Sequence, residues 1–154
     1  MLAELNSVIE GRRILLLGAG NRLRGDDAVG SLLIERLQSK VNIPLIDAGD
    51  VPENYLGPIE DSGAEVVLVV DATDMGANVG DVAIFDIEQV IGKSVSTHTA
   101  NLGLLFKVIS PKKRPQVVVL GIQPGNLDLG QKLSEPVKKT LDALLEMLLI
   151  LFSG

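Results

Sequence analysis

Several residue types with distinctive chemistry are scarce or missing in this chain of 154 residues. There is no cysteine, which excludes disulfides, thiolate metal sites and cysteine nucleophiles, so any bound metal must use nitrogen and oxygen ligands. Tryptophan is absent and aromatic residues make up only 3% of the chain, which argues against an aromatic platform for stacking nucleic-acid bases. Histidine occurs once, as His98.

Positive charge is also in short supply. The formal net charge is −6 and the isoelectric point is near 4.7, so the chain would be repelled by a phosphate backbone and nucleic acid is not an expected partner. The N-terminal residues lack the basic region and long apolar core of a signal peptide. The apolar segment 141–152 is too short to span a membrane and is interrupted by Asp142 and Glu146. We therefore expect a cytoplasmic protein without membrane insertion.

Apolar runs alternate with helical patterns along the whole chain. Residues 14–17 and 66–70 are uniformly apolar, which is typical of central parallel strands buried on both faces. Weaker strand patterns occupy 43–46, 82–85 and 117–120, and helical patterns occupy 2–10, the stretch from Asp27 to Lys40, 101–109 and 134–152. No internal repeat or linker divides the chain. The sequence predicts one domain over residues 1–154, a three-layer α/β/α sandwich with a five-stranded, mostly parallel sheet.

A glycine-rich stretch joins the first strand to the helix after it, between Gly18 and Gly30. Such a loop can bind phosphate, because backbone N–H groups and a helix N-terminus attract anions. The spacing fits neither a dinucleotide fingerprint, which would need a glycine at Leu23, nor a Walker-type loop, which would need Lys and Ser or Thr at Asp26 and Asp27. The two acids favour a cation over an anion as the ligand.

Each candidate residue also has a purely structural interpretation. Asp26 and Asp27 are well placed to cap the following helix, and Asp71 at the end of its strand can accept hydrogen bonds from loop N–H groups. His98 alone is more often a surface or hydrogen-bonded residue than a ligand. In a doubly wound sheet, however, the loop after the first strand and the end of the third open onto the same edge. Together, Asp27, Asp71 and His98 would offer ligands that suit Zn²⁺, Ni²⁺ or Mn²⁺.

Several motifs, taken in order, resemble the hydrogenase maturation endopeptidases, and most closely the type that serves the formate-hydrogenlyase enzyme. The resemblance runs from Ile14 to the closing helix. The motifs are Gly18-x-Gly20-Asn21, Gly25-Asp26-Asp27-x-x-Gly30, Val70-Asp71-Ala72-Thr73-Asp74-Met75-Gly76, Ser96-Thr97-His98, Pro52-Glu53-Asn54 and Gly121-Ile122-Gln123-Pro124.

This resemblance implies an endopeptidase that removes a C-terminal extension from the [NiFe]-hydrogenase large-subunit precursor after nickel insertion. It places the catalytic and metal-contacting residues at Asp27, Asp71 and His98, with nickel supplied by the precursor. The family usually has two glycines where this chain has Ala48-Gly49, which bears on precursor preference. A non-catalytic nickel- or nucleotide-binding chaperone of hydrogenase assembly and a metallohydrolase of small peptides remain the alternatives, and the oligomeric state stays open.

Overall fold

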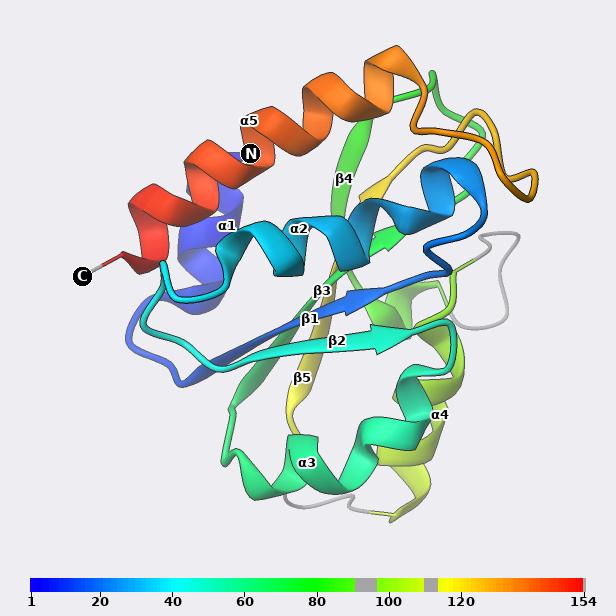
Figure 1. Ribbon diagram of the computed structural model, residues 1–154. Helices are drawn as coiled ribbons and strands as arrows, with labels where there is room; N and C mark the ends of the chain where they lie inside the picture. The colour runs from blue at the N-terminus through cyan, green and yellow to red at the C-terminus, as the bar shows by residue number, and fades with distance from the viewer. Residues whose placement is uncertain (91–96, 110–113, 154) are drawn as a thin grey trace.

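A five-stranded sheet with the order β2-β1-β3-β5-β4 organises the chain in the computed structural model, which describes residues 1–90, 97–109 and 114–153 (Figure 1). Neighbouring strands are parallel except at one edge, where β4 runs antiparallel to β5. The strands are β1 (Ile14–Ala19), β2 (Leu45–Gly49), β3 (Val66–Ala72), β4 (Val82–Asp86) and β5 (Gln116–Ile122). The expected five-stranded, mostly parallel sheet is confirmed.

Helices cover both faces of the sheet, so the molecule has the three layers predicted from the sequence (Figure 1). One face carries α1 (Leu2–Ile9), α2 (Val29–Leu37) and α5 (Glu135–Phe152), and the other carries α3 (Leu56–Asp61) and α4 (Ala100–Ile109). Short 3₁₀ helices precede α2 and α3, namely η1 (Gly25–Ala28) and η2 (Pro52–Tyr55), and a third, η3 (Ile87–Gln89), follows β4.

The two central strands are buried along their whole length because helices pack on both of their faces. Every residue of β1 and of β3 is buried. Alternate side chains enter two separate apolar clusters, since Leu16 and Leu68 face α2 and α5, whereas Leu15 and Val67 face α3 and α4. This explains why both strands appear in the sequence as continuous apolar runs.

The second strand lies further along the chain than its sequence predicts. The sequence predicts a strand over residues 43–46, whereas β2 begins at Leu45 and continues to Gly49. Pro44 lies just before the strand, where its carbonyl accepts the Leu16 N–H at 3.1 Å. Because β2 is an edge strand and mostly half-buried, its apolar pattern is weak, and Asp47 is paired with Gly18 inside the sheet.

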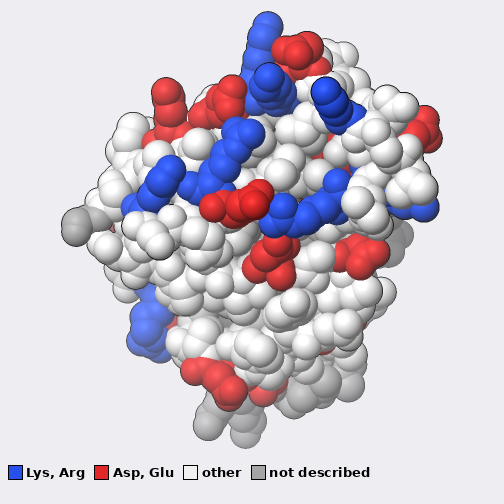
Figure 2. All heavy atoms as spheres, in the orientation of Figure 1, with Lys and Arg blue, Asp and Glu red and all other residues white. Residues whose placement is uncertain are grey.

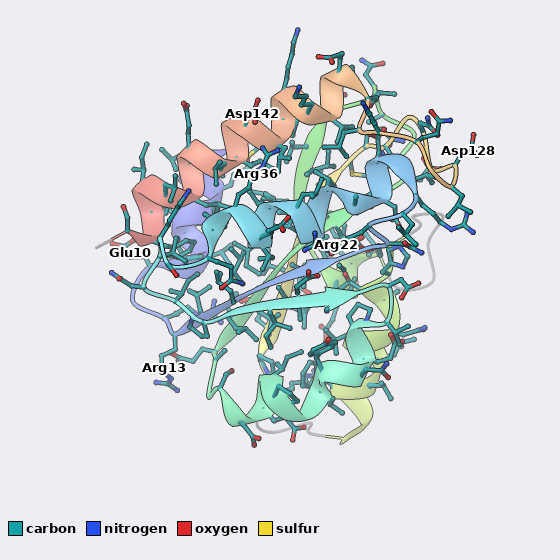
Figure 3. All side chains as sticks on the ribbon, in the orientation of Figure 1. Glu10, Arg13, Arg22, Arg36, Asp128 and Asp142 are labelled. Carbon is teal, nitrogen blue, oxygen red and sulfur yellow. The ribbon has the colours of Figure 1, made fainter. Side chains whose placement is uncertain are left out.

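The closing helix α5 lies across α2 on one face of the sheet (Figure 1). The buried side chains of α5 form one stripe along the helix. Basic and acidic side chains lie on the exposed surface over α5 and α2 (Figure 2). Arg36 on α2 points toward Asp142 on α5, with 3.2 Å between Nη1 and Oδ1 (Figure 3). None of the helices in the described part of the chain is long and apolar enough to cross a membrane.

Helix α2 lies unusually close to the sheet because glycines meet at the contact. A Cβ added to Gly30 would lie 2.3 Å from the Val70 carbonyl oxygen and 2.5 Å from that of Ala19. A Cβ on Gly18 of β1 would in turn lie 2.4 Å from the carbonyl oxygen of Gly30. These contacts are with backbone atoms, which have little freedom to move. The glycines of the first motif therefore serve helix–sheet packing, and they fix where η1 and α2 sit over β1 and β3.

We expect Gly30→Ala to lower the free energy of unfolding by about 3 kcal/mol, because the new methyl group must push α2 away from the sheet. Urea denaturation followed by circular dichroism measures the change. Gly57→Ala in α3 is the matched control, since nothing lies within 4 Å of the added Cβ. That change should be neutral or stabilising by up to about 1 kcal/mol. Equal effects of the two substitutions would contradict the close-packing interpretation.

Candidate functional site

The structure brings the three predicted site residues together at the carboxyl-terminal edge of the sheet. One candidate ligand atom from each of Asp27, Asp71 and His98 lies within 4.8 Å of the others. Asp27 belongs to η1 after β1, Asp71 lies near the end of β3, and His98 lies in the turn before α4. Asp27 and Asp71 meet because β1 and β3 are parallel neighbours whose carboxyl ends lie at the same edge of the sheet. His98 joins them because its own N–H donates a hydrogen bond to Asp71.

Asp71 is the buried centre of this site. Its side chain is fully shielded from solvent, and its Oδ2 accepts hydrogen bonds from the Thr97 hydroxyl, from the His98 N–H at 2.9 Å and from the Thr99 hydroxyl at 3.3 Å. Its other oxygen, Oδ1, is buried and has no hydrogen-bond partner among the described residues. Burial raises the pKa of Asp71 to about 6, despite the hydrogen bond from Thr97.

His98 pairs with Asp27 across the site. Its Nε2 lies 2.9 Å from Oδ1 and 3.1 Å from Oδ2 of the Asp27 carboxylate. The hydrogen bond to Asp27 is the main reason that the pKa of His98 rises to about 9; burial opposes the rise and the charge of Asp71 adds to it. Asn21 fixes the same carboxylate by donating its N–H to Oδ2 at 2.8 Å. At neutral pH the metal-free site therefore contains an imidazolium paired with a carboxylate.

Asp26 and Asp27 are adjacent in the chain but have opposite environments. Asp26 is fully buried and accepts hydrogen bonds from the N–H groups of Gly125, Asn126 and Ser134 and from the Ser134 hydroxyl. Burial alone would raise the pKa of Asp26, but these donors outweigh it and hold the pKa below its ordinary value. Asp26 thus ties η1 to the loop after β5 and to the start of α5.

The helix-capping interpretation of these two acids is wrong. Neither η1 nor α2 has a side-chain hydrogen bond at its N-terminal cap. Ser134 occupies the N-cap position of α5, but its hydroxyl donates a hydrogen bond to Asp26 instead of capping the helix. The acids therefore serve contacts distant in sequence, which local patterns do not reveal.

Sequence reasoning missed the residues that hold the site in place. Thr97 and Thr99 flank the histidine, and both donate hydroxyl hydrogen bonds to Asp71. The alternation Thr-His-Thr at residues 97–99 was a usable signal, because hydroxyl donors two residues apart can converge on one carboxylate. Ser96, the first residue of the predicted histidine motif, lies outside the described residues.

The donor set fits a divalent transition metal. Asp27 and His98 present one carboxylate and one imidazole, and the unpartnered Oδ1 of Asp71 is an oxygen with a free lone pair in a buried position. Nitrogen and oxygen ligands of this kind suit Zn²⁺ or Ni²⁺, and three of them leave coordination positions for other groups. Because His98 must be neutral to bind a metal, binding would release its proton.

The site lies within a fold that solved relatives share. A family model described as hydrogenase maturation protease matches residues 28–150. The hydrogenase 3 maturation protease of Escherichia coli K12 is 34% identical over 137 residues, covering 87% of each chain. A crystal structure of a [NiFe] hydrogenase maturation protease from Thermococcus kodakarensis has a TM-score of 0.86 and 32% identity, covering 98% of this chain and 99% of that one. This chain belongs to the hydrogenase maturation protease family.

As a hydrogenase maturation protease, the protein is a peptidase. The solution structure of the endopeptidase HycI from Escherichia coli has the same fold as this chain, with a TM-score of 0.73 and 30% sequence identity, and the match covers 87% of each chain.

Beside the acid–histidine cluster of this hydrogenase maturation protease, a hollow of about 330 Å³ lies between the turn at Gly20 and Asn21 and the end of β2 at Asp47. Burial would raise the pKa of Asp47, but hydrogen bonds from Ser31 and Arg22 lower it.

We expect the stability of the metal-free hydrogenase maturation protease to fall as the pH rises from 6.5 to 9. His98 binds its proton more tightly in the folded than in the unfolded chain. The pairing of His98 with Asp27 therefore contributes its full stabilisation of the folded state below about pH 6.5, and this contribution is lost as the pH passes about 9. The expected loss is about 1–2 kcal/mol after solvent screening. Chemical denaturation across this pH range should show it in the wild type, whereas His98→Gln should have a flatter profile. Parallel profiles would contradict the pairing.

Proposed function

We propose that this protein is a nickel-dependent endopeptidase that removes the C-terminal extension of a [NiFe]-hydrogenase large-subunit precursor in the cytoplasm, after nickel has been inserted. Membership of the hydrogenase maturation protease family supports the class of substrate. The observation that carries the metal dependence is the convergence of Asp27, Asp71 and His98 around a buried, unpartnered carboxylate oxygen.

The chemistry of the donor set favours nickel that arrives with the substrate. Three protein ligands without sulfur should bind a divalent metal with moderate affinity, and the precursor's own ligands would complete the coordination. In the absence of metal, His98 and Asp27 neutralise each other, so the site does not depend on a permanent ion. Nickel on the precursor would therefore act as part of the substrate and report that its insertion is complete.

The residues of the chain have distinct tasks in the proposed reaction. A bound metal would polarise the scissile carbonyl or activate a water molecule. Asp71, with its pKa near 6, can exchange a proton close to neutral pH through its free Oδ1. Thr97 and Thr99 hold the opposite oxygen of that carboxylate, and Asn21 holds Asp27. These contacts fix both acids before the substrate binds, which lowers the cost of reaching the reactive geometry.

We expect the protein to cleave a nickel-loaded cognate precursor and to leave the nickel-free precursor intact. Mass spectrometry of the products after incubation with each form measures this directly. Cleavage that ignores nickel would contradict the metal dependence. Binding of the loaded precursor without any cleavage would favour the non-catalytic chaperone instead.

Asp71→Asn and His98→Ala should each reduce the cleavage rate by at least about a hundredfold, because each removes a ligand or a proton-exchanging group from the site. Both variants should remain folded by circular dichroism. Asp142→Asn, which removes an exposed acid from α5, is the matched control and should retain the wild-type rate. Calorimetry with Ni²⁺ alone gives a second measure: the two site variants should lose binding and the control should keep it. Undiminished cleavage by either site variant would remove that residue from the proposed site.

A further inference from the structure

Exposed leucines gather on two loops beside the candidate site. Among the described residues, Leu23 and Leu129 are the most exposed leucines, at 66% and 65%, and Leu127 is exposed at 46%. Leu23 lies in the loop between β1 and η1, and the other two lie between β5 and α5. We call these three residues the leucine rim. Asp128, in the same loop, is at the right of Figure 3, and at that place Figure 2 shows uncharged surface between acidic and basic side chains.

The two loops are fixed against each other. The Gly130 N–H donates to the Leu23 carbonyl at 2.8 Å, and the Asp26 N–H donates to the Asn126 carbonyl at 2.7 Å. A Cβ on Gly25, whose φ is +52°, would lie 2.3 Å from the same Asn126 oxygen, so the loops touch closely there. The buried Asp26 carboxylate adds its bonds to Gly125 and Asn126. The leucine rim is therefore held on a rigid backbone despite its exposure.

The leucine rim is continuous with the peptidase site. Asn21, whose N–H holds the Asp27 carboxylate, also accepts the Leu23 N–H on its side-chain oxygen at 2.8 Å. Asp26, which fixes the loop of Leu127, is the chain neighbour of Asp27. A protein substrate whose terminal segment reaches Asp27 would therefore meet the leucine rim with its adjoining surface.

We propose that the leucine rim binds an apolar surface of the folded large-subunit precursor while the precursor's C-terminal segment lies in the site. This inference rests on the proposed function, which supplies a protein as the substrate. Rigid, exposed apolar side chains beside a binding site favour association, because they lose contact with water and little freedom on binding. The net charge of −6 disfavours the other occupants of such a surface, a second copy of this chain or an anionic membrane.

The double variant Leu23→Ser/Leu129→Ser tests the leucine rim. With nickel-loaded precursor as the substrate, its KM should rise by about tenfold or more, while kcat stays within about twofold of the wild type. Ile150→Ser is the matched control, because Ile150 is 76% exposed on the last turns of α5. Its KM and kcat should match the wild type. Circular dichroism should show that both variants are folded.

The outcomes separate this inference from the proposed function. An unchanged KM in the double variant, or an equal rise in Ile150→Ser, overturns the docking role and leaves the peptidase intact. If the wild type neither cleaves nor binds the precursor, both proposals fail. Sedimentation velocity tests whether a second copy of this chain occupies the leucine rim instead. A wild type that is a dimer and a double variant that is a monomer would assign the leucine rim to self-association and overturn the proposal.

Discussion

The candidate site depends on the burial of one carboxylate at the end of a central strand. Asp71 has no access to water, and a charged group there is tolerated only where donors replace its hydration. The segment 97–99 supplies three such donors, all to Oδ2. The same contacts that stabilise Asp71 therefore tether this segment to the sheet edge and place the His98 imidazole opposite Asp27. The position of the segment 97–99 and the geometry of the site therefore both depend on the burial of Asp71.

The neighbouring acids show how the fold divides two identical side chains between structure and chemistry. Asp26 is surrounded by donors from the loop after β5 and from the start of α5, so its charge is fully used in joining segments about one hundred residues apart. Asp27 faces the site and forms an ion pair with His98, which a metal ion could replace. The close approach of α2 to the sheet at Gly30 fixes the direction of η1, and therefore decides which of the two acids faces the site.

The sequence predicts those parts of the fold in which burial is uniform. The apolar runs of β1 and β3 made the sheet and its carboxyl edge predictable, and with them the approach of Asp71 to Asp27. The half-buried edge strand β2 was misplaced because most of its residues are only partly buried, which weakens its apolar pattern, and because Pro44 lies next to it. Thr97 supports the site, and Asp26 does not cap a helix, because both residues form hydrogen bonds with segments distant in the sequence. The alternation Thr-His-Thr is a local signal for the threonine contacts with Asp71, whereas no local pattern indicates that Asp26 binds a loop about one hundred residues away.

The electrostatics of the site bear on when a metal would bind. His98 holds its proton to about pH 9 because Asp27 stabilises the imidazolium, so a metal must displace that proton and break the ion pair before it can use either ligand. This competition weakens binding of a free ion at neutral pH, whereas Asp71 offers an oxygen to which no described residue donates a hydrogen bond. A metal that arrives already coordinated by a bound protein substrate has additional contacts to offset the cost. The acid–histidine pair is therefore an argument for the proposal that the protein recognises a loaded precursor and does not store a permanent metal, and the loops beside it would supply those additional contacts.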